Sequence, residues 1–183
     1  MNSKKRIIGV VSVGDVPELA PKVIAAHIIG YLKLAAEILP PLENPSCAFD
    51  ERHLQYNAAT LLRFFESCSY DNYDKVVGVF NVDLFIPTFA YVFGEAKQGG
   101  KHALVSLFRL AKEKGIHNPP SSLVLERAAK VALHELGHLY NLAHCEDTKC
   151  LMHYSGGLAD LDSIPLYFCR YCNTYFQDAL LRP

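Results

Sequence analysis

Residues 134–145 read HELGHLYNLAHC and contain the most informative pattern in the chain. His134 and His138 are four positions apart, so on a helix both imidazoles project from one face and can bind one metal ion. Glu135 projects beside that ion, where a carboxylate can take a proton from a bound water. Two surface histidines on an ordinary helix are the alternative, but the pattern arises by chance in roughly one protein of this length in a few hundred. We therefore expect a metal site on this helix.

His144 lies six residues after His138, on a different face of a straight helix. The chain must therefore turn sharply after His138 to bring His144 to the same metal. Such a turn needs a left-handed residue, and Asn141 is, after glycine, the residue type best suited to that conformation. Three neutral imidazoles leave one position of the metal open for water, which is typical of catalytic zinc.

A second set of metal-binding side chains follows directly after His144. Cys145 and Cys150 form one close pair, and Cys169 and Cys172 form a CxxC pair. Four thiolates in two pairs suit a tetrahedral structural zinc site. Disulfides and a redox-active CxxC pair are the alternatives; the lack of a recognisable export signal argues against the first, and the absence of the usual strand-to-helix context argues against the second. Because Cys145 adjoins His144, we expect the structural zinc to fix the geometry of the catalytic one.

With these residues, the chain resembles the archaemetzincin family of zinc metallopeptidases, which belongs to the metzincin clan. That family shows HExxHxxGxxH, then CxxxxCxM and a distant CxxC, and this sequence matches across residues 134–172 with Asn141 in place of the glycine. The resemblance implies that Met152 forms the Met-turn and packs beneath the three histidines without binding the metal. Tyr154 stands where some other metzincins carry a tyrosine that contacts the metal or the oxyanion, although a tyrosine that only packs explains it equally well.

The resemblance also implies the fold: α+β (mixed α/β), metzincin-like, with a twisted mixed sheet, two main helices and a small zinc-stabilised C-terminal subdomain. The chain has 183 residues, 50% of them hydrophobic, which fits one globular domain. We expect a single catalytic domain over residues 1–183. Its N-terminal subdomain at 1–143 includes the active-site helix, and its C-terminal subdomain at 144–183 holds the Met-turn and the four-cysteine site.

Apolar periodicity and composition predict the individual elements of this fold. Runs rich in Val, Ile and aromatic residues predict strands at 7–13, 75–80, 91–95 and 102–107. Apolar residues of helical period predict helices at 17–39, 54–65, 123–142 and 173–181. The first helix is expected to end at Pro40–Pro41, and Ser121 or Ser122 is a suitable N-cap for the third.

Composition limits the partners and the compartment of the chain. The formal net charge is -1, so a nucleic-acid partner is not expected. Lys4, Lys5 and Arg6 before the apolar run 7–13 have the order of a signal peptide, but the run is short and lacks an A-x-A cleavage site. No apolar stretch is long enough to cross a bilayer. We therefore expect a cytoplasmic protein with no membrane partner; the sequence does not indicate an oligomeric state.

We expect the chain to be a zinc metallopeptidase that binds two Zn²⁺ and hydrolyses peptides or proteins. Zinc lowers the pKa of its bound water toward about 7, and Glu135 takes the proton and passes it to the leaving amine. The first strand begins near residue 7, which leaves no room for a pro-segment, so we expect short or restricted peptides as substrates. The alternatives are a zinc-stabilised peptide-binding module with little or no turnover, and a hydrolase of non-peptide amides.

Overall fold

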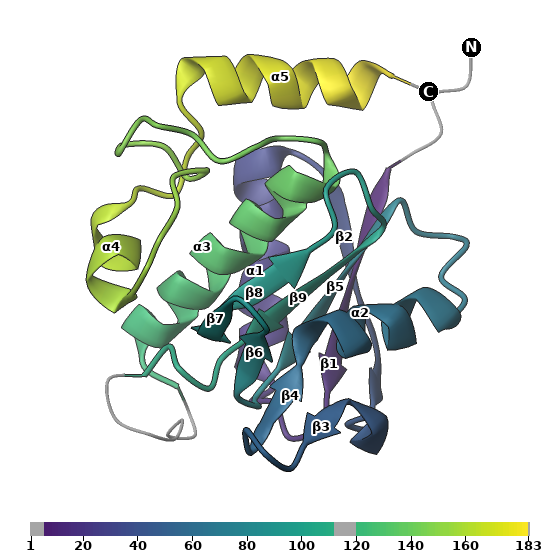
Figure 1. The fold of residues 1–183 in the computed structure, drawn as a ribbon. Helices are drawn as coiled ribbons and strands as arrows, with labels where there is room; N and C mark the ends of the chain where they lie inside the picture. The colour runs from purple at the N-terminus through teal and green to yellow at the C-terminus, as the bar shows by residue number, and fades with distance from the viewer. Residues whose placement is uncertain (1–5, 112–119, 183) are drawn as a thin grey trace.

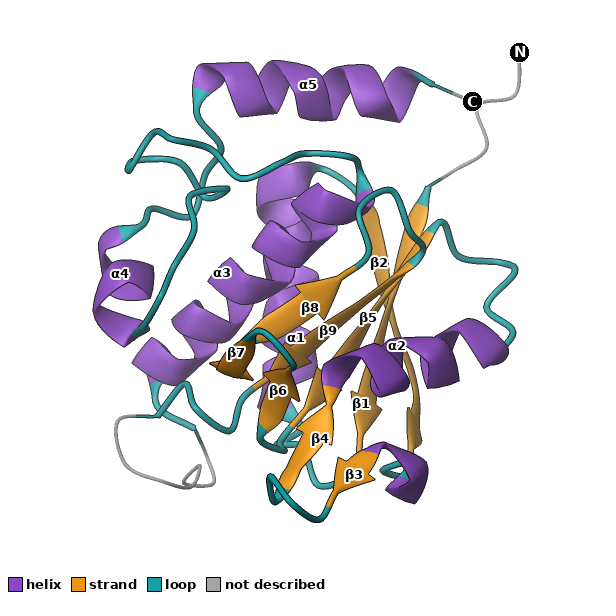
Figure 2. Cartoon of the chain, in the orientation of Figure 1, coloured by secondary structure: helices purple, strands orange, loops and turns teal. Residues whose placement is uncertain are grey.

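The computed structural model describes residues 6–111 and 120–182, so Lys4 and Lys5 lie outside the described residues. A twisted, mixed five-stranded sheet forms the middle of the molecule (Figure 1). Helices α1 (Leu19–His27) and α3 (Ser122–Leu139) pack against each other on one face of it, and α2 (Ala58–Ser67) covers the other face (Figure 2). This arrangement has the mixed α/β class and the mixed sheet that the sequence predicts.

The main sheet has the strand order β2-β1-β5-β9-β8. All neighbouring pairs are parallel except β8 with β9, which are antiparallel. The central strands are buried on both faces, which explains why they read as continuous apolar runs. The strand bounds are β1 Ile7–Val13, β2 Ala35–Leu42, β5 Lys75–Phe80, β8 Gly94–Ala96 and β9 His102–Ser106.

The helix predicted at 17–39 is wrong beyond its first half. After α1, a π-helical turn (Ile28–Leu32) leads to Lys33, whose φ of 58° is left-handed and ends the helix. Residues from Ala35 onward then form β2, which pairs with β1 at the edge of the sheet. An edge strand tolerates proline, so Pro40–Pro41 lies inside this strand and does not stop a helix.

A second, four-stranded sheet has the order β3-β4-β6-β7 and was not predicted as a unit. The helix predicted from Leu54 is wrong at its start, because Leu54 has a φ of 53° and is 74% exposed. Helix α2 begins only after Asn57, whose side chain accepts a hydrogen bond from the Thr60 amide as an N-cap. The strand predicted at 91–95 is two strands, β7 and β8, separated at Phe93. The remaining bounds are β3 Phe49–Asp50, β4 Gln55–Asn57, β6 Leu84–Ile86 and β7 Phe89–Val92.

Helix α3 begins as predicted, with Ser121 as N-cap; its hydroxyl accepts a hydrogen bond from the Val124 amide at 3.3 Å. Two further helices follow, α4 (Leu158–Ser163), which was not predicted, and α5 (Arg170–Leu181), which begins earlier than predicted. The buried Arg127 of α3 donates two hydrogen bonds to the Asp162 carboxylate, at 2.7 and 2.6 Å, and so joins α4 to α3. Within the described ranges, no helix combines the length and apolarity needed to cross a membrane.

Candidate active site

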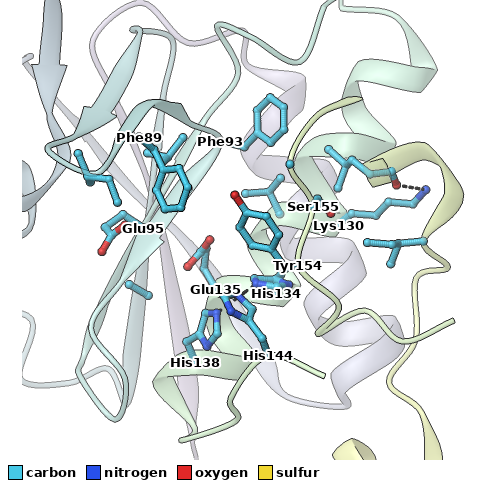
Figure 3. A pocket seen from close by; sticks show the side chains of 18 of the residues that line it. Phe89, Phe93, Glu95, Lys130, His134, Glu135, His138, His144, Tyr154 and Ser155 are labelled. Carbon is cyan, nitrogen blue, oxygen red and sulfur yellow. Dashed lines mark hydrogen bonds between the residues drawn. The ribbon is translucent and has the colours of Figure 1, made fainter. Parts of the chain in front are cut away.

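The structure brings the three histidines of the motif together. His134 and His138 lie one turn apart on α3, and their neighbour Asn141 has a φ of 67°, the left-handed conformation predicted for it. Amides after the helix close its end: those of Asn141 and Leu142 donate to the carbonyls of His138 and Gly137, each at 3.0 Å. The turn returns the chain to α3, and the ligand nitrogens of His134, His138 and His144 all lie within 4.8 Å of one another (Figure 3).

Hydrogen bonds fix which nitrogen of each helical histidine faces the others. His134 Nδ1 donates to the Leu151 carbonyl and His138 Nδ1 donates to the Leu142 carbonyl, both at 2.8 Å; since a carbonyl only accepts, each Nδ1 carries the proton. The two Nε2 atoms therefore present lone pairs to each other, 3.1 Å apart. Ligands of a tetrahedral zinc at about 2.0–2.1 Å lie roughly 3.3 Å apart, so the donor set fits this ion.

Electrostatics keep these histidines neutral, as metal binding requires. Burial, together with the neighbouring His138, lowers the pKa of His134 to about 3. Burial likewise lowers the pKa of His138. Neither imidazole therefore carries a second proton near neutral pH, and each Nε2 is available to a cation.

Glu135 is 8% exposed and lines the same cavity as the three histidines (Figure 3). Burial raises the pKa of its carboxyl well above the usual value, and the nearby Glu95 carboxylate raises it further. Gly94 of β8 faces this side chain: a Cβ built on Gly94 would lie 2.7 Å from Glu135 Oε1. A carboxyl group with a raised pKa suits a general acid and base near neutral pH.

Met152 is fully buried beneath α3. A Cβ added to Gly137, one residue before His138, would collide with Met152 Sδ and lie 3.1 Å from its Cε. The Met152 carbonyl also accepts a hydrogen bond of 2.9 Å from the Cys145 amide, next to His144. Met152 therefore packs against α3 next to His138, and its carbonyl is hydrogen-bonded to the residue after His144.

Tyr154 is half-exposed on the cleft side of the same segment. Its ring centroid lies 5.5 Å from that of His144 and 6.1 Å from that of Phe89. The structure thus places Tyr154 beside the histidines, within the same cavity lining as Glu135. It also gives the ring a second contact, with Phe89, that the sequence did not suggest.

The four predicted cysteines form a second cluster, with all sulfur atoms within 4.8 Å of one another. The sulfurs of Cys145 and Cys169 are 3.9 Å apart, close to the roughly 3.8 Å expected for two thiolates at about 2.3 Å from a tetrahedral zinc. Cys150 Sγ accepts hydrogen bonds from the amides of Met152 and Cys169, at 3.4 and 3.2 Å, which stabilise a thiolate. No disulfide joins these four cysteines in the structure.

A cavity of about 530 Å³ extends past the histidines, between β8 and the segment that follows Met152. Several of its lining residues were missed by sequence reasoning. Lys130 lies one turn before His134 on α3, so helical period could have pointed to it. Phe89 and Leu161 belong to the short elements β7 and α4, and Ile164 follows α4; none of them lies in a motif, and nothing in the sequence distinguished them.

Comparison with known proteins agrees with this geometry. The model of peptidase family M54 matches residues 23–178, most of the chain and both clusters of ligands. The chain belongs to the archaemetzincins, peptidase family M54. As a member of that family it is a zinc metallopeptidase, a hydrolase, and the prediction of the family from residues 134–172 is confirmed.

Relatives named archaemetzincin cover most of the chain. The protein of Methanocaldococcus jannaschii is 38% identical over 144 residues, 78% of this chain and 77% of its own. That of Pyrococcus furiosus is 34% identical over 182 residues, 96% of this chain and 95% of its own. The crystal structure of archaemetzincin from Methanopyrus kandleri superposes with a TM-score of 0.87 at 31% identity, covering 100% of this chain and 99% of that one. The shared fold confirms the predicted metzincin-like class.

Proposed function

We propose that this archaemetzincin hydrolyses short or restricted peptides, with zinc held by His134, His138 and His144 and with Glu135 as the general base and acid. The observation that carries the proposal is the pair of Nε2 lone pairs 3.1 Å apart on α3. Two such groups repel each other unless a cation lies between them. Glu135, which belongs to the same helix and lines the same cavity, supports a hydrolytic role for that cation.

Zinc, when bound there, acidifies a water molecule and polarises the scissile carbonyl. The remaining chemistry belongs to the protein. Glu135 accepts the proton of the attacking water at its carboxylate and then donates that proton to the leaving amine. Burial raises the pKa of Glu135, which favours the protonated carboxyl and so supports the donation of the proton to the leaving amine. We also propose that Tyr154, whose ring lies against His144, contacts the metal or the developing oxyanion.

We propose a second zinc, held by Cys145, Cys150, Cys169 and Cys172, as a structural ion. The sulfur spacing and the amide donors to Cys150 support this assignment. The ion would join α5 to the loop that carries His144 and so organise residues 144–183 as the C-terminal subdomain beside the N-terminal subdomain at 1–143.

The experiment that tests the proposal compares the wild type with Glu135→Gln on a diverse library of short peptides. We expect cleavage by the wild type and a loss of at least about a hundredfold in the variant, since general base catalysis contributes that much. The variant should keep the zinc content of the wild type, because Glu135 is not a proposed ligand. A peptide-binding module without turnover predicts no cleavage by either protein, and equal cleavage by both would contradict the role of Glu135.

A further inference from the structure

Two contacts cross the cleft a short way from the metal-binding side chains. Phe89, on the hairpin of β6 and β7, packs against Tyr154 with ring centroids 6.1 Å apart. Tyr91, on the same hairpin, donates a hydrogen bond from its hydroxyl to the Gly156 carbonyl at 3.4 Å. All four residues line the cavity that holds the three histidines. Phe89 and Tyr91 belong to the hairpin wall, and Tyr154 and Gly156 belong to the opposite wall, formed by the segment after Met152. We call Phe89, Tyr91, Tyr154 and Gly156 the aromatic bridge.

On the hairpin, Tyr91 of the aromatic bridge is held by contacts with Arg109 and Phe93. The Arg109 guanidinium lies over the Tyr91 ring, 4.5 Å from its centroid. Arg109 in turn forms a bidentate ion pair with Asp83, with both N–O distances at 2.5 Å. The Tyr91 ring also packs edge-on against Phe93, with centroids 5.5 Å apart, just before β8. These contacts oppose movement of the hairpin away from Tyr154 and Gly156.

The fold indicates which end of a substrate meets the aromatic bridge. Strand β8 is the edge of the main sheet, and an extended peptide can add to such an edge by backbone hydrogen bonds. Antiparallel addition is the commoner and more stable geometry. The carboxyl side of the peptide would then run backward along the chain, from Gly94 toward Phe93 and Tyr91. The same orientation places the leaving amine near Gly94, against which the Glu135 carboxylate lies.

We propose that the aromatic bridge closes the cleft on the carboxyl side of the scissile bond, so that substrates carry only a few residues there. This inference rests on the proposed function and adds to it the side of the scissile bond on which the length of the peptide is limited. Strand β8 ends at Gly94, and the chain bends at Phe93 into β7, whose Tyr91 is three positions from Gly94. At about 3.3 Å per residue, a peptide therefore has room for about three residues between Gly94 and the bridge. A longer carboxyl side meets the bridge. At the other end of β8, Gln98 Nε2 donates a hydrogen bond to the Asn141 carbonyl at 3.2 Å, so the amino side meets a different contact. The substrate class is therefore peptides cut near their carboxyl terminus.

The test uses two series of peptides that share one scissile bond and are followed by mass spectrometry. In one series the carboxyl side grows from one to eight residues, and in the other the amino side grows by the same steps. For the zinc-loaded wild type we expect kcat/KM to fall about tenfold or more once the carboxyl side exceeds about three residues, since the ring contact and the hydrogen bond must then break. On the amino side, any length effect would come from the contact between Gln98 and Asn141, so the substitutions described next should leave it unchanged.

The matched variant is the double substitution Phe89→Ala and Tyr91→Phe, which removes one ring and one hydroxyl from the aromatic bridge. We expect the ratio of long-peptide to short-peptide kcat/KM to rise about tenfold. Phe49→Ala serves as control, because Phe49 is also an exposed phenylalanine but lies on β3 outside the cavity lining; its ratio should equal that of the wild type.

Two results would overturn the inference while leaving the proposed function intact: equal turnover of long and short carboxyl sides by the wild type, or a length effect confined to the amino side. An unchanged ratio in the double variant would also overturn it, because the bridge would then not be the obstacle. Failure of the zinc-loaded wild type to cut any peptide would refute the proposed function itself, and the directional inference with it.

Discussion

Alanine in place of Gly94 should displace the Glu135 carboxylate without touching a zinc ligand. The added Cβ would lie 2.7 Å from Glu135 Oε1 and 2.8 Å from its Cγ, whereas an ordinary contact is about 3.5 Å. The Cβ cannot move away from Glu135, because the backbone carbonyl oxygen of Leu104 on β9 would lie only 2.8 Å from it. The Glu135 side chain must therefore move by roughly 0.8 Å. A misplacement of about 1 Å can cost a catalytic group about a hundredfold in rate.

We expect the Gly94→Ala enzyme to lose about ten- to a hundredfold in kcat/KM, mainly through kcat, on a short peptide that the wild type cuts. Zinc content should be unchanged, which separates a displaced base from a lost metal. Gly30→Ala is the matched control: no heavy atom lies within 4 Å of a Cβ added there, and Gly30 does not line the cavity. A Gly94→Ala enzyme that keeps more than half of the wild-type kcat/KM would refute the placement of Glu135 argued above.

Three further predictions concern stability. Asp162→Ala leaves the 1%-exposed Arg127 without its bidentate partner, so we expect a loss of about 2–3 kcal/mol, visible as a fall in Tm of roughly 5–10 °C; an unchanged Tm would contradict the role of this ion pair. At Asn141, whose φ is 67°, glycine should preserve or raise the free energy of unfolding in urea, while valine should lower it by about 1–2 kcal/mol; equal values for the two variants would show that this backbone conformation carries no cost. Cys169→Ser should lower Tm more than His134→Ala does, because a closed structural zinc site contributes directly to folding; the opposite order in a thermal melt would count against that assignment.

The ligand clusters could be found from the sequence because the information is local. His134, Glu135 and His138 are placed by helical period alone, and the turn that returns His144 to them depends on one residue, Asn141, whose side-chain type indicates its left-handed φ. The strands at 7–13 and 75–80 could also be predicted from the sequence, because strands that are buried on both faces carry uninterrupted apolar runs.

The elements that were predicted wrongly depend on tertiary pairing. Residues 35–42 carry an apolar spacing compatible with a helix, and only pairing with β1 makes them a strand. The wall of the cleft was missed for another reason: β6 and β7 form a hairpin of three- and four-residue strands, too short to show a clear alternation, so Phe89 and Tyr91 were not recognised as cleft residues. Helix α4, with six residues, is too short to show a period.

The central claim is that His144 completes a catalytic metal site beside a separate four-cysteine site. Its most direct test is zinc per chain, measured by inductively coupled plasma mass spectrometry on purified wild type and His144→Ala, together with peptide turnover. One ion for each ligand cluster predicts two zinc per chain in the wild type, and one in the variant with turnover lost. Fewer than two zinc in the wild type, or two zinc with full turnover in His144→Ala, would contradict the account.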